Sequence, residues 1–405
     1  MSRYYKASSS GLIYYNLTLL AWLTLVLSFC LEIGMNYHLA SGKISSSALT
    51  GLALVWTVGA GIISYFILKI FNIKMYLDSS EIPFVYFSIF YITGNLLISF
   101  FSALFYALKN FIAPNLILIT CNIILICLMP KKSNESLAQD HFIYIYYTSF
   151  LFQGVLIFLL FIMKNLPGLK IRLPGKVDMM LLLGMSVWAF LTNGLAMVLY
   201  RLDYWFVDHY CSTRDLGNYI QASKIGQAFL VIPSIISTAV FPMMASGMLK
   251  SPVKNIQSLT RSLVFFSSIP AIILVFTGKW LFPYILGNSF ELMYIPFVLL
   301  IPGLLAFCLI CPITAYYGGK KILYVNFVSL LTAVMVVIIL DALTVPEYGI
   351  KAAAIVSSLG YLCYAGCLIW FFNKQHSIRI ANFFTIRYSD FGWVKKLISK
   401  ADNLL

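Results

Sequence analysis

The sequence predicts an all-helical protein that crosses a membrane many times. Hydrophobic residues make up 61% of its 405 residues, and charged residues only 10%, whereas soluble domains are near 45–50% apolar and about 25% charged. The apolar runs continue for about 20 residues, as a transmembrane helix requires, and they lack the period-two alternation of transmembrane β-strands. These observations exclude an ordinary cytosolic enzyme, a disordered chain and a nucleic-acid-binding domain.

Eleven stretches are long and apolar enough to span a bilayer. They lie at about 12–37, 48–71, 83–107, 111–129, 142–163, 179–207, 217–246, 262–283, 293–317, 321–341 and 350–372. The connections between them are short, so none forms a soluble domain large enough to hold a catalytic site. We therefore expect a polytopic membrane protein that has no separate catalytic domain and is not an enzyme.

The connection at 164–178 divides the predicted spans into two groups. It is the most basic internal connection and contains Pro167 and Pro174. We predict a linker there, between an N-terminal bundle of about five spans at 1–163 and a C-terminal bundle of about six at 179–372. A basic tail follows at 373–405. Its mixture of cations and aromatic residues suits either a segment lying on the anionic inner leaflet or a frayed end.

The distribution of basic residues predicts the orientation. Eleven spans put the termini on opposite sides of the membrane, and 17 Lys and Arg fall on the side of the C-terminus against nine on the other. Because basic residues are retained on the cytoplasmic side, we expect a cytoplasmic C-terminus. Without the tail the difference narrows to 11 against nine, and Lys131 and Lys132 fall on the outer side.

Polar side chains within the apolar spans are the best functional candidates, because a charge at a helix centre costs about 2.5–3.5 kcal/mol. In the span at 179–207, spacings of seven and eight residues predict one polar helical face, and in the span at 217–246 a spacing of three predicts a second. The predicted substrate-binding residues on these faces are Arg201, Lys224, Asn193, Gln221 and Gln227.

Arg201 and Lys224 are both expected in the outer half of the bilayer, where they would offer positive charge to an anionic substrate. Arginine supplies a planar fork and lysine a point charge for phosphate oxygens. Two structural alternatives stay open. An ion pair between Asp203 and Lys224 would join the two helices, and Arg201 would reach outward to the interface.

The same region carries a family resemblance. The run Arg201-Leu-Asp203-Tyr-Trp, then Leu216-Gly-Asn-Tyr-Ile-Gln-Ala222, and then Pro242 resembles polysaccharide flippases of the Wzx type, in the multidrug/oligosaccharidyl-lipid/polysaccharide superfamily. Two further motifs agree: Leu286-Gly-Asn-Ser-Phe290, and Val345-Pro-Glu-Tyr-Gly-Ile-Lys-Ala-Ala-Ala354. The second motif departs from the family pattern: where the family has its second glycine, this sequence has Lys351 or Ala352.

The resemblance implies a MATE-like, V-shaped fold of two bundles that rock to give alternating access. It implies export of an undecaprenyl-diphosphate-linked O-antigen or capsule repeat unit across the bacterial inner membrane. Polysaccharide polymerase and chain-length regulator are the implied partners, beside membrane lipids. Relatives usually have 12 or 14 helices, whereas eleven spans are predicted here. The resemblance therefore implies that the family's first helix is missing, either because the reading frame is truncated or because the protein genuinely has eleven helices.

The resemblance also implies ion coupling through acids within the spans, since superfamily relatives couple transport to protons or sodium. Glu32 and Asp203 are the candidates, although Glu32 would equally cap against His38 or Lys43. No cofactor, metal site or nucleic-acid partner is predicted, because the cysteines and histidines do not form a ligand set. Alternative functions are a cation-coupled multidrug exporter, a membrane polymerase or glycosyltransferase, and a defective transporter.

Overall fold

The computed structural model describes residues 7–70, 84–128, 136–165, 172–245, 251–320, 322–377 and 380–383, together with 385 and 390. Every regular element within these ranges is a helix, which confirms the predicted all-α class. The chain divides into two compact units. One comprises Asn16–Gly194, and the other combines Met1–Tyr15 with Leu195–Leu405.

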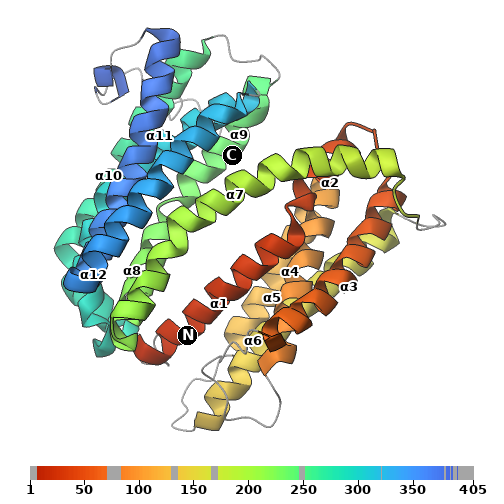
Figure 1. The fold of residues 1–405 in the computed structure, drawn as a ribbon, viewed down its shortest axis with the longest axis horizontal. Helices are drawn as coiled ribbons and strands as arrows, with labels where there is room; N and C mark the ends of the chain where they lie inside the picture. Colours follow the sequence, from red (N-terminus) through yellow and green to blue (C-terminus); the bar gives the residue numbers. More distant parts are fainter. Residues whose placement is uncertain are drawn as a thin grey trace, which may run out of the picture. The chain divides into compact units, whose positions relative to one another are not determined.

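The unit of residues 16–194 is built around one central helix. It contains the later part of α1 (Ala7–Ser28) and the first half of α7 (Lys176–Tyr210). Between them come α2 (Leu31–Ala40), α3 (Ser46–Ile70), α4 (Phe84–Ala107), α5 (Ile112–Cys127) and α6 (Ser136–Asn165). Helix α4 packs against α2, α3, α5 and α6 (Figure 1), so it forms the centre of this bundle.

Helices α4 and α6 approach each other through two glycines. A Cβ on Gly94 would overlap the backbone of Phe150 and Leu151, and a Cβ on Gly154 would lie 2.7 Å from the carbonyl oxygen of Gly94. Small residues at a membrane helix interface allow this approach, and the resulting dispersion contacts stabilise the pair. The glycines are therefore required by packing and not by backbone conformation.

Gly94→Ala is expected to lower stability by about 1–3 kcal/mol, because an added methyl group in a filled interface forces the helices apart. The measurement is the midpoint of thermal unfolding of the purified protein in detergent. Gly59→Ala in α3 is the matched control, because a Cβ there meets nothing within 4 Å. Alanine also favours a helix over glycine, so Gly59→Ala should be neutral or stabilising; equal losses in both variants would contradict the packing argument.

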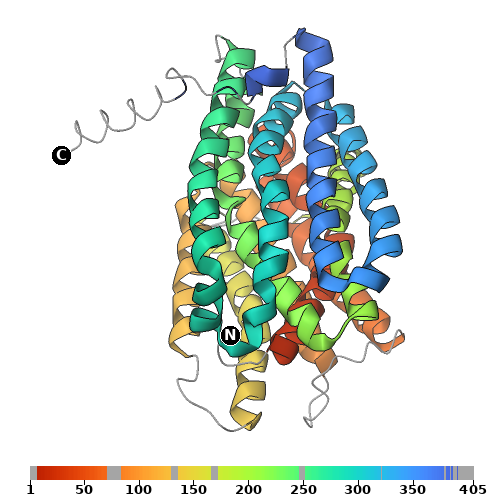
Figure 2. The ribbon, with the colours of Figure 1, turned by 90° about the vertical axis from the view of Figure 1, so that its left-hand side faces the viewer.

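The second unit contains the first turns of α1, the end of α7, and the remaining helices. These are α8 (Thr213–Ala228), α9 (Val231–Ala245), α10 (Pro252–Leu286), η1 (Asn288–Met293), α11 (Tyr294–Gly319), α12 (Leu323–His376) and η2 (Ile380–Phe383). Helix α11 packs against α8, α9, α10 and α12. Figure 2 shows α10, α11 and α12, in teal to blue, running side by side.

Two sequence motifs explain breaks in this unit. Gly287 adopts a φ of 105° between α10 and η1, a conformation that favours glycine, and it is followed by the buried Phe290. Gly349 adopts a φ of 59° and a ψ of −142° within α12. Three residues earlier, Pro346 cannot donate a backbone hydrogen bond. Both glycines therefore mark places where a helix must end or break.

Within the described residues, fewer helices qualify as uninterrupted spans than the eleven that were predicted. Eight of the described helices are long and apolar enough to cross a membrane, and nine if the pair α8 and α9, bent by 42°, forms one span. The predicted spans at 321–341 and 350–372 lie in the single 54-residue helix α12, which breaks at Gly349. At about 1.5 Å per residue α12 is far longer than the hydrocarbon core of about 30 Å. The predicted span at 111–129 is α5, which has only 16 residues.

The division between the two compact units falls within α1 and α7, and the bundles at 1–163 and 179–372 stay a prediction. The first half of α7 packs along α2: His38 Nε2 lies 3.2 Å from the carbonyl oxygen of Leu181, and Gly34 lies against Leu182 and Ser186. Most of the predicted linker, residues 166–171, lies outside the described residues.

The described part of the predicted tail is integrated into the second unit. Residues 374–376 complete α12, Phe383 is fully buried in the core around α11 and α12, and Asp390 forms an ion pair with Arg261 of α10. Residues 391–405, which carry the predicted lysine and tryptophan contacts with the leaflet, lie outside the described residues.

Candidate functional site

The structure brings two of the predicted substrate residues together inside the second unit. Arg201 on α7 donates from Nη2 to Oε1 of Gln227 on α8 at 3.4 Å, and its guanidinium carbon lies 5.3 Å from the centre of the Tyr204 ring. The helices α7 and α8 are joined by a tight turn in which Ser212 Oγ accepts from the amide of Asp215. This turn fixes the two helices side by side and so places both side chains.

Arg201 and Gln227 line a cavity of about 210 Å³. Four helices and the bend after α8 contribute its wall, which consists of Tyr200, Arg201, Ser223, Gln227, Leu230, Leu300, Leu304 and Tyr361. The wall is therefore partly apolar, and its polar groups are a guanidinium, an amide and hydroxyl groups. A ligand pocket with a few convergent polar groups in an apolar setting has this composition.

Lys224 lies one turn before Gln227 on α8 and is held by an aromatic ring. Its Nζ lies 2.7 Å from the centre of the Tyr14 ring of α1. Arg201 is close enough for the two positive charges to repel each other. The predicted bridge to Asp203 is not formed: among the described residues no carboxylate lies within ion-pairing distance of Lys224.

Asp203 instead joins three helices. It is 2% exposed, and its Oδ2 accepts from the hydroxyls of Tyr219 on α8 and, at 2.9 Å, Ser357 on α12. Its Oδ1 accepts from the amide of Tyr204 at 2.9 Å. Tyr219 and Lys224 both lie on α8, but residues five apart on a helix point in different directions. The sequence alone could not show which of the two faces the Asp203 carboxylate.

Asp341 is a functional candidate that the sequence analysis missed. It lies on the first half of α12, is 0% exposed, and neither of its carboxylate oxygens accepts a hydrogen bond from a described residue. It is near enough to Asp203 for the two carboxylates to repel each other. The sequence could have identified Asp341, because burying an acid within an apolar span costs free energy and such an acid is therefore a candidate functional residue.

The other predicted substrate residues do not line the cavity. Gln221 is buried on α8 but points elsewhere, since residues six apart on a helix differ by about 120° in direction. Asn193 belongs to the unit of residues 16–194, where its Nδ2 donates to the Cys30 sulfur at 3.5 Å. Of the three-residue stripe predicted on α8, Gln227 lines the cavity; Ser223 lines it as well, and Lys224, which follows Ser223, is not part of the described wall.

Glu32 occupies the first turn of α2, directly after a break in the helix. Phe29 and Cys30 have φ values of 49° and 50°, a left-handed conformation that costs free energy for residues with a side chain. The Oε2 atom of Glu32 is enclosed and accepts no hydrogen bond from a described residue. The predicted capping partners are engaged elsewhere, His38 with Leu181 and Lys43 with the ring of Tyr37.

Comparisons with known proteins identify the fold. No family model matches the sequence, and no curated protein matches it. A lipid II flippase MurJ structure in an inward closed conformation aligns with a TM-score of 0.68 at 14% identity, covering 93% of this chain and 86% of MurJ. An inward-facing multidrug resistance MATE transporter of the MOP superfamily aligns with a TM-score of 0.69 at 12% identity, covering 93% of both chains.

A third neighbour is a point mutant of the Vibrio cholerae MATE transporter VcmN, with a TM-score of 0.64 at 12% identity and coverage of 93% of this chain and 90% of VcmN. Identities this low establish the fold and leave the substrate open. The chain therefore has the MATE-like polytopic fold that the sequence predicted.

Proposed function

We propose that this protein is a flippase that moves an undecaprenyl-diphosphate-linked oligosaccharide, an O-antigen or capsule repeat unit, to the outer face of the bacterial inner membrane by alternating access. One observation carries the proposal: Arg201 lies in the wall of a partly polar cavity within an apolar bundle, and a second basic residue, Lys224, is near enough to interact with it electrostatically. The likeness to a flippase of lipid II supports the same class of substrate.

The chemistry of a diphosphate suits this arrangement. Two like charges held close in an apolar bundle repel each other, and an anion between them reverses that repulsion. The Arg201 fork can donate two parallel hydrogen bonds to phosphate oxygens, and Lys224 adds a point charge. The apolar wall at Leu300 and Leu304 leaves the prenyl chain free to remain in the bilayer.

Asp203 and Asp341 are proposed to couple transport to a monovalent cation. Together with the hydroxyls of Tyr219 and Ser357 they supply oxygen ligands of the kind that hard cations and protons prefer. The Coulomb repulsion between the two carboxylates favours uptake of a positive charge. Glu32 in the other unit is a second candidate for the same role, because its Oε2 atom is enclosed without a described partner.

A cation-coupled multidrug exporter is the second candidate function. It is favoured by the similarity to multidrug resistance transporters and by the buried acids Asp203 and Asp341. The cavity that contains Arg201 argues against it, because a cationic drug would be repelled there. The polymerase and chain-length partners depend on the flippase proposal. The cytoplasmic C-terminus is proposed separately, from the distribution of basic residues.

The decisive experiment is complementation of a bacterial host that lacks its flippase and makes the cognate repeat unit. The expected result is restored long-chain polysaccharide on the cell surface. Absence of surface polysaccharide, with normal protein in the membrane and export of cationic dyes, would overturn the flippase proposal in favour of the drug exporter.

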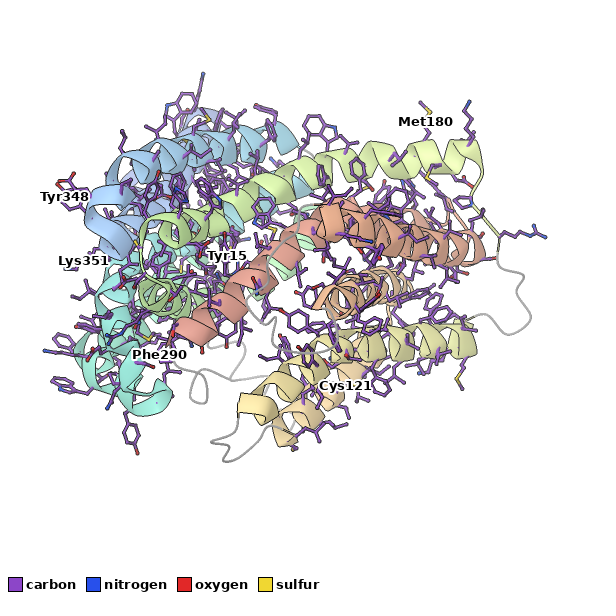
Figure 3. The ribbon with its side chains drawn as sticks, turned by 60° about the horizontal axis from the view of Figure 1, so that its bottom comes forward. Tyr15, Cys121, Met180, Phe290, Tyr348 and Lys351 are labelled. Carbon is purple, nitrogen blue, oxygen red and sulfur yellow. The ribbon has the colours of Figure 1, made fainter. Side chains whose placement is uncertain are left out.

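Arg201→Ala and Lys224→Ala are each expected to lower export about tenfold, because a charge-assisted hydrogen bond contributes about 1.5–3 kcal/mol and the remaining cation retains part of the attraction. The measurement is surface polysaccharide at matched protein level. Lys351→Ala removes an exposed cation of the same unit (Figure 3) and serves as the control. Unchanged export in both the Arg201→Ala and the Lys224→Ala variant would remove these residues from the substrate site.

A further inference from the structure

The first turns of α1 lie directly on α8, within the unit that contains both. A Cβ on Gly217 would overlap the carbonyl group of Ala7, and a Cβ on Gly11 would lie 2.6 Å from the Cα of Gly217. The amide of Ala7 also donates to Ser289 Oγ at 3.2 Å. The backbones can approach this closely only because both contact residues are glycines.

A contact between a cation and an aromatic ring joins this packed segment to the candidate site. Tyr14, one turn after Gly11, presents its ring to the ammonium group of Lys224. Lys224 stands next to Ser223 and one turn before Gln227, and both of these residues line the cavity with Arg201. The Lys224 side chain is therefore shared between the α1 segment and the edge of the anion site.

The two possible partners of this ammonium group compete. A cation over an aromatic face gains about 1–2 kcal/mol or more when it is shielded from water. An anion near Arg201 attracts the same group more strongly, because it carries a full charge. Since Nζ has one position at a time, movement toward an anion separates it from the ring.

We propose that Lys224 exchanges partners during transport: it binds the Tyr14 ring, and so holds the segment Ala7–Tyr15 on α8, until an anionic headgroup at Arg201 draws it away and loosens that segment. The inference rests on the proposed function, because it takes the cavity as the headgroup site. It adds a coupling that the cavity alone does not provide, namely that loading the site weakens the docking of α1.

Thermodynamic linkage requires the headgroup and the Tyr14 ring to affect each other's binding to Lys224 equally. If the headgroup weakens the contact of Lys224 with Tyr14, that contact must weaken headgroup binding by the same factor. Removing the ring should therefore tighten binding. A purely structural Tyr14 would leave the affinity unchanged, and a Tyr14 that touches the substrate would weaken binding when removed.

The experiment measures the affinity of purified protein for farnesyl diphosphate, with farnesol as the uncharged control probe. Tyr14→Leu is expected to tighten binding about 5- to 30-fold, the equivalent of the 1–2 kcal/mol above. Tyr14→Phe keeps the aromatic face and should stay within about twofold of the parent. In a Lys224→Met background, which keeps the side-chain stem, Tyr14→Leu should have no effect on affinity.

A second readout follows the segment itself. Ser10 is 2% exposed, so a cysteine introduced by Ser10→Cys should react slowly with a maleimide while α1 is docked. Farnesyl diphosphate should accelerate that reaction several-fold, and farnesol should not. The parent protein without Ser10→Cys corrects for labelling of the native cysteines.

The outcomes separate the two proposals. If the parent binds farnesyl diphosphate and Tyr14→Leu leaves that affinity unchanged or weakens it, the exchange is overturned and the anion site stands. The same holds if farnesyl diphosphate does not alter the labelling rate. Failure of the parent to bind farnesyl diphosphate more tightly than farnesol overturns the anion site and the exchange with it.

Discussion

Asp341→Asn is expected to lower gradient-driven transport by up to about 150-fold, the upper range of coupling between two sites on one protein. Asparagine has the shape of aspartate and cannot bind a proton or balance the charge of a cation. If Asp341 takes up the coupling ion beside Asp203, the variant should still bind substrate and should lose only the dependence on the gradient.

The measurement is substrate translocation in membrane vesicles with an imposed sodium gradient and, separately, an imposed pH gradient. Whichever gradient accelerates the parent identifies the ion. Asp341→Asn should abolish that acceleration with little loss of stability, because it removes a carboxylate that has no described hydrogen-bond partner. Undiminished acceleration in the variant would exclude Asp341 from coupling.

Asp203→Asn is the informative companion. Its carboxylate accepts hydrogen bonds from Tyr219, Ser357 and the amide of Tyr204, so an amide nitrogen in its place leaves at least one donor facing another donor. This variant should lose stability as well as coupling. Tyr219→Phe removes one donor and keeps the carboxylate; it should lower stability and preserve the response to the gradient, which separates the structural part of the role from the ionic part.

Hydropathy was enough to predict the fold class. Backbone polar groups inside a bilayer must be hydrogen-bonded within the protein, so long apolar stretches form helices there. It could not place every break. The apolar pattern of 321–372 has a gap near Pro346, yet the helical backbone continues to Gly349 before it breaks. Similarly, the predicted span at 217–246 contains the bend between α8 and α9, which hydropathy does not reveal.

Part of the candidate site could be predicted from the sequence. What could not be predicted is the direction in which each helix turns its polar face. Arg201, Lys224 and Gln227 were recognisable as polar residues in apolar runs, and the structure places them near one another. The partners of Lys224 and Asp203 were not recognisable. Tyr14, which contacts Lys224, and Ser357, which donates to Asp203, come from distant parts of the chain, and the face that each helix presents depends on packing that spacing alone does not fix.

The end of the chain illustrates a different limit. Composition suited either a segment on the membrane surface or a frayed end, and neither anticipates the buried ion pair that its first part forms. Asp390 is 1% exposed and Arg261 on α10 is 5% exposed. The guanidinium binds both carboxylate oxygens, at 2.5 and 2.6 Å, and Nη1 donates to the carbonyl group of Asn382. Ser262 Oγ donates to the carbonyl oxygen of Asp390 at 2.9 Å.

Asp390→Ala or Arg261→Ala is therefore expected to cost about 3–5 kcal/mol, because each leaves an uncompensated buried charge. The cost should appear as a fall of on the order of 10 °C in the unfolding midpoint in detergent. Arg214→Ala is the matched control. It breaks an ion pair of similar length, 2.7 Å to Glu291, whose side chains are 51% and 58% exposed, and exposed pairs contribute at most about 1 kcal/mol.

A double variant distinguishes the buried charge from the lost packing. Replacing both partners by apolar residues of similar size, as in Arg261→Met with Asp390→Leu, removes the uncompensated charge while filling the same space. It should recover much of the stability that either single variant loses, because a well-packed apolar pair often equals a buried ion pair. If the double variant is as unstable as the single ones, the segment is held by the geometry of the guanidinium fork itself, which also binds the backbone at Asn382.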